Sequence, residues 1–290
     1  MIIIEPAGGL CNRLRAIHSA IAMADSLDRP LEMVWLANDG MGASFRDLFE
    51  QPARISRVYE FDKNKKTFMK NIRYEIARNF RMQRLRPNLQ PPKVMDLLDA
   101  GFDFESLKVK RRIHIKSWSL FFGEEKSFFP FEPVKELREK ISAVKNGFDK
   151  TVGVHIRRSD LEESIATSPT ELFIQEMREE IAREPETRFF LATDDREEEE
   201  RMGDLFGDRI IIFKKETRSR QELVAIGDAV VDLYCLASTS RIIGSNGSSF
   251  TEVAARLGQI PLTIMNSKHP HGIHKGIAPQ SRDGSRGWHI

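Results

Sequence analysis

The sequence has few cysteines and no long apolar run. Its two cysteines, Cys11 and Cys235, lie far apart, and no Cys-x-x-Cys or Cys/His metal-site spacing is present. Isolated cysteines are typical of free thiols in a reducing compartment, so we expect a cytoplasmic protein. No stretch approaches the roughly 18 apolar residues of a membrane span, and Met1 leads directly into three isoleucines. We therefore expect neither a transmembrane helix nor a signal peptide.

Strong net charge is also absent, although the charge is unevenly distributed. The formal net charge of the 290 residues is +2, so the whole chain has no strong attraction to nucleic acid. Segment 63–86 holds nine Lys or Arg residues against one acid, interspersed with apolar residues, which predicts a basic amphipathic helix. A solvated helix face is the simplest interpretation. Binding of an acidic acceptor or peripheral contact with a membrane are alternatives, and no recognition motif makes nucleic acid an expected partner.

Strands and helices alternate in both halves of the chain. In the first half, apolar runs predict strands at 1–5, 31–36, 54–59 and 111–118, with a helix from about Asn12 and a loop at 87–92. In the second half, predicted strands at 151–156, 188–192, 209–213, 241–243 and 261–265 alternate with predicted helices at 134–144, 169–182, 197–205, 221–236 and 250–257. This alternation predicts an α/β protein with two doubly wound domains. The phenylalanine-rich segment 119–133 is expected to connect them and to pack.

The first predicted strand ends in a glycine loop, Gly8-Gly9-Leu10-Cys11-Asn12-Arg13. Paired glycines let a ligand approach the backbone closely, and the start of the following helix favours anions. Gly-x-Gly-x-x-Gly is missing, so the loop is no dinucleotide fingerprint. The amide of Asn12 can cap the helix or face a bound sugar, and a plain tight turn is the alternative.

The predicted strand at 151–156 leads directly into Arg157 and Arg158. Two adjacent guanidiniums at a strand end repel each other unless a partner compensates their charge. Ligands of open α/β sheets bind just beyond the carboxyl ends of the strands, and arginine binds phosphate with paired hydrogen bonds. We therefore interpret the pair, which His155 and Asp160 flank, as a diphosphate clamp. Two ordinary surface arginines are the alternative.

Three further polar positions follow in the second half. Asp194 and Asp195 come after the strand at 188–192, where they can form a site or cap the next helix. The loop 244–251, Gly-Ser-Asn-Gly-Ser-Ser-Phe-Thr, leads into a helix whose N-terminus suits phosphate, although a capped turn is the alternative and no Walker motif is present. Asp232 lies in an apolar stretch, where a carboxylate needs donors such as the two adjacent N–H groups of guanine, unless it lies on an exposed helix face.

In this order the blocks resemble the motifs of a known family. His155-Ile-Arg157-Arg158-Ser-Asp160 resembles the His-x-Arg-Arg-x-Asp motif of the nodulation and core-type fucosyltransferases, which are related to the protein O-fucosyltransferases. Later blocks of that family resemble Ala192-Thr-Asp194-Asp195, then Asp232-Leu-Tyr-Cys-Leu-Ala-Ser with Ser248-Ser-Phe-Thr251. The glycine loop is similar to the Gly-x-x-Asn loop of related enzymes, whereas segment 63–86 matches nothing in the family.

The resemblance implies a GT-B glycosyltransferase fold, with two Rossmann-like domains facing each other across a cleft. Residues 1–130 would form the acceptor-side domain and residues 131–290 the nucleotide-sugar-binding domain. The reaction would be the inverting transfer of fucose from GDP-fucose to a glycan hydroxyl, without a metal or other cofactor. The chain lacks the extra domains of animal relatives, which implies a bacterial form acting on a soluble or lipid-linked glycan.

The resemblance also implies roles for individual residues. Arg157 would bind the diphosphate and balance the charge on the leaving GDP, Arg158 would assist it, and Asn12 would face the sugar and acceptor as the third catalytic residue. The further contacts with the GDP-sugar would come from His155 as an assisting residue, Asp160 fixing the arginine loop, Asp194 near the ribose, Asp232 at the guanine, Ser248 and Ser249 at phosphate oxygens, and Phe250 and Gly9.

The chemistry of glycosyl transfer agrees with this assignment. Transfer through an oxocarbenium-like state pushes negative charge onto the diphosphate, which fixed cations can stabilise in place of a metal. No Asp-x-Asp metal motif is present, and Glu162 and Glu163 lie near the arginines without a secure match to the family's acceptor-side carboxylate. The arginines would recognise GDP rather than fucose, so the donor sugar and the acceptor stay open. A GDP-binding module without catalysis, or a nucleic-acid-binding protein using segment 63–86, is the alternative function.

Overall fold

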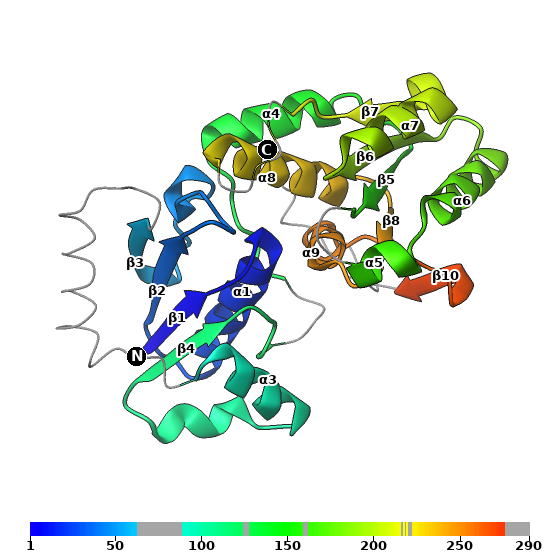
Figure 1. The fold of residues 1–290 in the computed structure, drawn as a ribbon. Helices are drawn as coiled ribbons and strands as arrows, with labels where there is room; N and C mark the ends of the chain where they lie inside the picture. The colour runs from blue at the N-terminus through cyan, green and yellow to red at the C-terminus, as the bar shows by residue number, and fades with distance from the viewer. Residues whose placement is uncertain are drawn as a thin grey trace, which may run out of the picture. The chain divides into compact units, whose positions relative to one another are not determined.

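The computed structural model describes residues 1–62, 89–123, 128–158, 162–215, 217, 219 and 222–275. It divides into two compact units, of which unit 1 comprises Met1–Val134 with Ser219–Gly227, and unit 2 comprises Lys135–Arg218 with Asp228–Ile290. Each unit is built on its own sheet (Figure 1). The predicted basic helix at 63–86 and the predicted site residue Asp160 lie outside the described residues. Among the helices within those ranges, none has the length and hydropathy that crossing a membrane requires.

Unit 1 contains a four-stranded parallel sheet with the order β3-β2-β1-β4. Its strands are β1 (Ile2–Pro6), β2 (Leu31–Ala37), β3 (Ile55–Asp62) and β4 (Ile113–Ser117), as predicted to within a few residues. The helices are α1 (Leu10–Ser26) and α3 (Pro91–Asp99), and Phe45–Asp47 and Phe104–Val109 form 3-10 turns. The predicted loop at 87–92 is wrong at its end, because α3 starts at Pro91, and proline fits the first turn of a helix.

An apolar stripe attaches α1 to the sheet of unit 1. Leu14, Ile17 and Ala24 of the helix are fully buried, as are Ile2 and Ile4 of β1. Each large aliphatic side chain buried in this way contributes about 1.5–3 kcal/mol relative to exposure. The packing of α1 therefore fixes the loop between β1 and α1, which is the glycine loop of the sequence.

The phenylalanine-rich segment packs within unit 1, as predicted. Phe121, Phe128 and Phe131 are buried. The backbone N–H of Phe121 donates to Ser19 Oγ at 2.9 Å, and the His18 ring of α1 stacks on Phe128 with a centroid distance of 4.8 Å. The segment is therefore part of the core of unit 1 rather than a free linker.

Unit 2 contains a six-stranded sheet with the order β10-β9-β8-β5-β6-β7. Its strands are β5 (Thr151–Ile156), β6 (Arg188–Thr193), β7 (Ile210–Ile212), β8 (Ile242–Ser245), β9 (Leu262–Asn266) and β10 (His269–Lys275). Its helices are α4 (Lys135–Lys145), α5 (Glu162–Thr167), α6 (Thr170–Arg183), α7 (Arg196–Phe206), most of α8 (Leu223–Ala237) and α9 (Ser249–Gly258). The five predicted strands are confirmed and are parallel, whereas the antiparallel β10 and the short α5 were not predicted.

The strand order of unit 2 reverses between β5 and β8. From β5 the chain adds β6 and β7 on one side, and then returns through α8 to place β8 on the other side of β5. In open α/β sheets, the crevice at such a switch point lies beyond the carboxyl ends of the strands and is the usual ligand site. The residues that follow β5 and β8 are therefore the expected ligand-binding residues of unit 2.

Gly244 of β8 permits a close approach of α9 to this switch point. A Cβ atom added there would lie 2.1 Å from Thr251 Cγ2, which no real structure tolerates. Glycine at this strand position therefore lets the first turn of α9 lie directly on the carboxyl end of β8. This packing brings Thr251 and its neighbours to the end of β5.

Candidate functional site

Arg157 follows β5 at the switch point of unit 2. Its backbone N–H donates to Ser245 Oγ at 3.0 Å, which ties the residue to the end of β8. Its Nε lies 3.6 Å from Asp194 Oδ2, and its side chain is 19% exposed. A guanidinium held at this place can bind an anion that enters the crevice.

Arg158 is used differently from Arg157. Its Nε donates to Glu198 Oε1 at 3.1 Å, and Nη1 donates to the carbonyl oxygen of Arg157 at 2.9 Å. Nη2 donates to the carbonyl oxygen of Ser168 at 3.1 Å and to Thr170 Oγ1 at 2.8 Å. The guanidinium thus contacts α6, α7 and the backbone of the arginine loop, and its predicted part in a diphosphate clamp stays a prediction.

The two aspartates after β6 have separate tasks. Asp195 is the N-cap of α7, since its Oδ1 accepts the N–H of Glu198 at 3.0 Å. Asp194 instead accepts the backbone N–H of Arg158 at 2.8 Å, while also facing Arg157. The capping alternative therefore holds for Asp195, and Asp194 belongs to the arginine loop.

His155 is a buried, uncharged member of the site. Its Nδ1 lies 2.6 Å from Thr251 Oγ1, and its ring stacks on Phe250 at a centroid distance of 4.9 Å. Burial holds the pKa of His155 well below its ordinary value, and although Asp194 opposes this, Arg157 and Lys215 add to it. At neutral pH the ring is therefore a neutral hydrogen-bonding group that joins β5 to α9.

Ser248 and Ser249 open α9 beside the same strand ends. Ser248 is the N-cap and is 4% exposed, but its side chain makes no capping hydrogen bond, and Gly247 before it has φ 68°. The first N–H groups of a helix have no partner within the helix, so its N-terminus attracts anions. This end of α9 therefore offers donors for a phosphate close to Thr251 and His155.

Asp232 is buried in α8, so the exposed-face alternative is wrong. It is 5% exposed and its Oδ2 lies 2.8 Å from Lys215 Nζ. Burial raises the pKa of Asp232 to about 6, although Lys215 acts in the opposite direction. Lys215, like Glu198, was missed at the sequence level, because no motif or spacing links either residue to its partner.

In unit 1, the glycine loop has a well-defined shape. Gly8 has φ 78°, and a Cβ added at Gly9 would meet no atom within 4 Å. Gly9 is the N-cap of α1, so Asn12 lies within the first turn and does not cap the helix as the sequence allowed. Asn12 Oδ1 accepts from Arg15 Nη2 at 2.8 Å, and Arg13 donates to the carbonyl oxygen of Gly8 at 2.8 Å.

The structure thus brings together most of the predicted residues of unit 2. The charges that shift the pKa of His155 belong to Asp194, Arg157 and Lys215, and Lys215 in turn contacts Asp232. Gly9 and Asn12 belong to unit 1. Within the described part of the chain, no three His, Cys, Asp or Glu side chains gather as a group that could hold a metal ion.

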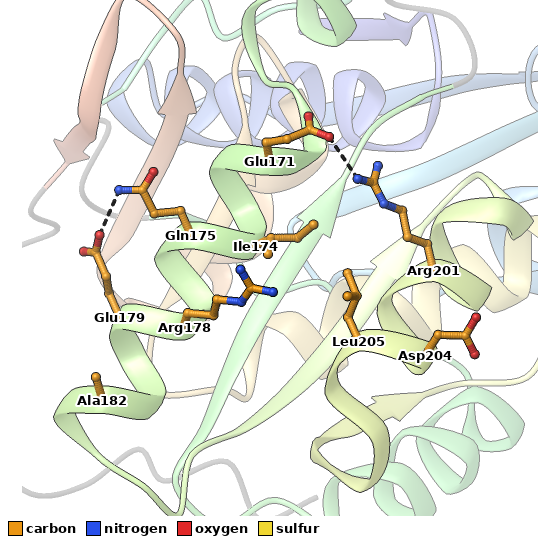
Figure 2. A pocket seen from close by; sticks show the side chains of 9 residues that line it. All are labelled: Glu171, Ile174, Gln175, Arg178, Glu179, Ala182, Arg201, Asp204 and Leu205. Atoms are coloured by element: carbon orange, nitrogen blue, oxygen red, sulfur yellow. Dashed lines mark hydrogen bonds and ion pairs between the residues drawn. The ribbon is translucent and has the colours of Figure 1, made fainter.

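A groove between α6 and α7 lies outside this cluster. Figure 2 shows Arg201 of α7 reaching Glu171 of α6, at 2.9 Å. The lining mixes apolar side chains with charges of both signs: Glu171, Ile174, Gln175, Arg178, Glu179, Ala182, Arg201, Asp204 and Leu205. None of the predicted site residues lines it, so the groove is not counted as part of the candidate site.

Comparison with known proteins shows a likeness of fold. No family model and no curated protein matches the chain. Among solved structures, the NodZ alpha-1,6-fucosyltransferase soaked with GDP-fucose matches with a TM-score of 0.59 and 19% identity over 91% of this chain and 94% of that chain. NodZ from Bradyrhizobium without a named ligand gives a TM-score of 0.58, also at 19% identity over 91% and 94%.

A second group of matches is more distant in sequence. POFUT1 in complex with GDP-fucose matches with a TM-score of 0.57 and 12% identity over 91% of this chain and 97% of that chain. A FUT1 variant of Arabidopsis thaliana in complex with GDP matches with a TM-score of 0.56 and 14% identity, over 91% of this chain and 69% of that chain. The chain therefore has the GT-B fold of these fucosyltransferase structures, with an α/β unit in each half.

Proposed function

We propose that the protein is a glycosyltransferase that moves fucose from GDP-fucose to a glycan hydroxyl with inversion and without a metal. The observation that carries this proposal is Arg157 at the β5/β8 switch point, beside the open N-terminus of α9. Both groups favour a diphosphate. The fold adds support, because solved structures of the same fold were obtained with GDP-fucose or GDP.

Charge stabilisation is the main catalytic task in this proposal. As the bond between the sugar and the diphosphate breaks, the sugar becomes oxocarbenium-like and negative charge builds up on the leaving GDP. Arg157 stabilises that charge, together with the N–H groups at the start of α9, Ser248 and Ser249. By analogy with an oxyanion-hole donor, such a preorganised group lowers the barrier by about 2.7–4 kcal/mol.

The neighbouring residues keep Arg157 and the nucleotide in place. Arg158 and Asp194 fix the loop that carries Arg157, through their contacts with α6, α7 and the loop backbone. Asp160 is assigned to the same loop on the resemblance alone. His155, which is buried and neutral, stacks on the partly buried Phe250, and the two rings would line the nucleotide side. Asp232 recognises the guanine base, and Asp194 also lies at the ribose side.

The acceptor end of the reaction is assigned to unit 1. Asn12 has an amide held by Arg15, and Gly9 leaves room for a ligand next to the backbone. Both would face the transferred sugar and the acceptor hydroxyl. No catalytic base is assigned, and Glu162 and Glu163 are exposed residues in the first turn of α5.

A nucleotide-binding series tests this proposal without knowledge of the acceptor. Isothermal titration should show saturable binding of GDP and GDP-fucose, with UDP and ADP much weaker. Asp232→Ala should remove the preference for guanine nucleotides. Arg157→Ala should weaken the binding of nucleoside diphosphates more than the binding of guanosine. Binding of GDP without any release of fucose would favour a non-catalytic GDP-binding module. Equal or absent binding of all nucleotides would contradict the proposal.

A further inference from the structure

Lys215 is the one cation that contacts the buried carboxylate of Asp232 among the described residues. Its Nζ lies 2.8 Å from Asp232 Oδ2 and donates to the carbonyl oxygen of Thr193, at the end of β6, also at 2.8 Å. Both side chains are 7% exposed. The ammonium therefore joins the segment after β7 to β6 and α8, at the carboxyl end of the sheet.

Each partner of this pair retains hydrogen-bonding capacity. Asp232 Oδ1 is buried and accepts no hydrogen bond from any described residue. An ammonium has three N–H donors. Two of them serve Asp232 and Thr193, and the remaining neighbour, Glu199 Oε1, is 3.6 Å away, beyond a normal hydrogen bond. An unsatisfied buried acceptor is unfavourable, and a ligand N–H group would satisfy it.

The surrounding charges explain why the lysine is needed. Burial raises the pKa of Asp232 most, Lys215 lowers it, and Glu199 of α7 and Asp228 of α8 add to the rise. Asp228 has its own partner, Lys140, at 3.6 Å, and the Cys235 thiol one turn further along α8 is buried. Lys215 thus keeps Asp232 an acceptor in an environment that would otherwise make it a donor.

We propose that Lys215 and Asp232 together select a 6-oxopurine base, with Lys215 donating to O6 and Asp232 Oδ1 accepting N1–H. The inference rests on the proposed function, since it concerns the base of the same GDP-sugar. Adenine presents an amino donor at position 6 and an acceptor at N1, so it mismatches both groups. Because Oδ1 is buried, a base reaches it only if the neighbouring side chains shift on binding.

This pairing differs from recognition by the carboxylate alone. If Asp232 accepted N1–H and the 2-amino group with its two oxygens, Lys215 would have to leave Oδ2, and the 2-amino group would be essential. If Lys215 and Asp232 share the base, the 2-amino group contributes little. IDP distinguishes the two arrangements, because it keeps O6 and N1–H but lacks the 2-amino group.

Isothermal titration of GDP, IDP and ADP therefore tests the proposal. Wild-type protein should bind GDP and IDP within about threefold of each other and ADP at least about 100-fold more weakly, as expected for a site built on polar pairing. Lys215→Met should weaken the binding of GDP and of IDP to a similar extent. The ratio of either affinity to that of ADP should fall below about tenfold. Lys214→Met, at the exposed neighbouring lysine, makes the same charge change and should leave the series unaltered.

Two further readouts guard against a variant that simply fails to fold. Lys215→Arg keeps a charged donor and should retain the preference for GDP over ADP. In Lys215→Met, GDP affinity should rise between pH 6 and 8.5, as Asp232 loses its proton, whereas the wild-type affinity should change less. If wild-type protein binds IDP at least tenfold more weakly than GDP, and Lys215→Met leaves the three affinities unchanged, this inference is overturned while the proposed function stands. Failure of the wild-type protein to bind GDP would overturn the proposed function as well.

Discussion

The segments that follow β1 in unit 1 and β5 in unit 2 both carry arginines, Arg13 at the start of α1 and Arg157 after β5, but their guanidiniums make opposite kinds of contact. Arg13 is 1% exposed, donates to the carbonyl oxygens of Gly8 and Leu36 at 2.8 Å, and lies 4.5 Å from the centre of the Trp35 ring. Arg157 is partly exposed at the switch point and faces a carboxylate at 3.6 Å. An arginine bound to carbonyl groups shapes its loop, whereas Arg157 can exchange a long ion pair for a phosphate.

Arg158 belongs with Arg13 in this comparison. Its donors go to carbonyl oxygens, to Thr170 and to the partly buried Glu198, so it also shapes a loop. The two adjacent arginines therefore make different contacts, and we propose that Arg157 is the one that meets a diphosphate directly.

Arg158→Met should lower the free energy of unfolding by about 3–5 kcal/mol, because it leaves the Glu198 carboxylate, whose side chain is 12% exposed, without its charged partner. Chemical denaturation measures the loss. The double variant Arg158→Met/Glu198→Gln is the control and should recover part of it, since the unpaired charge is gone. A single variant as stable as the wild-type protein would mean that Arg158 is not a structural residue, and the comparison with Arg13 would fail.

The sequence predicted the sheets better than the side-chain partnerships. Apolar runs located every strand of both sheets except β10, whose sequence, His-Pro-His-Gly-Ile-His-Lys, has no apolar alternation. The short α5 starts with two glutamates and shows no stripe, and the prolines that open α3 resembled a loop. Such local signals are weak because tertiary packing decides these segments.

The places of the candidate residues at strand and helix ends were predictable, but the contacts between their side chains were not. The end of β5 and the start of α9 followed from strand and helix boundaries. In contrast, the contact of Arg158 with Glu198 spans 40 residues, and that of Lys215 with Asp232 joins a loop to a helix. Long-range pairs of this kind leave no spacing in the sequence, so the sequence suggested a two-arginine clamp where the structure separates the two side chains.

Arg157→Ala should slow GDP-fucose turnover by about 10²–10³-fold, which corresponds to about 2.7–4 kcal/mol of barrier. The loss of stability should be smaller than that in Arg158→Met. Steady-state hydrolysis of GDP-fucose and thermal unfolding check the two parts. Arg157→Lys keeps a point charge without the paired donors and should retain intermediate activity. A stability loss with normal turnover would place Arg157 with Arg13 instead.

Arg13→Met should have a smaller effect, and on stability alone. It leaves the carbonyl oxygens of Gly8 and Leu36 without their donor, at a cost of about 2 kcal/mol. Affinity for GDP should stay at the wild-type value, because the proposed nucleotide site is built from unit 2. Denaturation measures the free energy of unfolding, and titration calorimetry on the same sample measures the GDP affinity. A loss of GDP affinity without a loss of stability would reverse the roles assigned to Arg13 and Arg157.

We propose that the fixed guanidinium of Arg157 does the work that a divalent ion does in other transferases. Its most direct test is the rate of fucose release from GDP-fucose by metal-free protein in excess chelator, compared with the rate after addition of manganese or magnesium. We expect the rate of fucose release to be equal in chelator, with manganese and with magnesium. Turnover that appears only with added metal would contradict it.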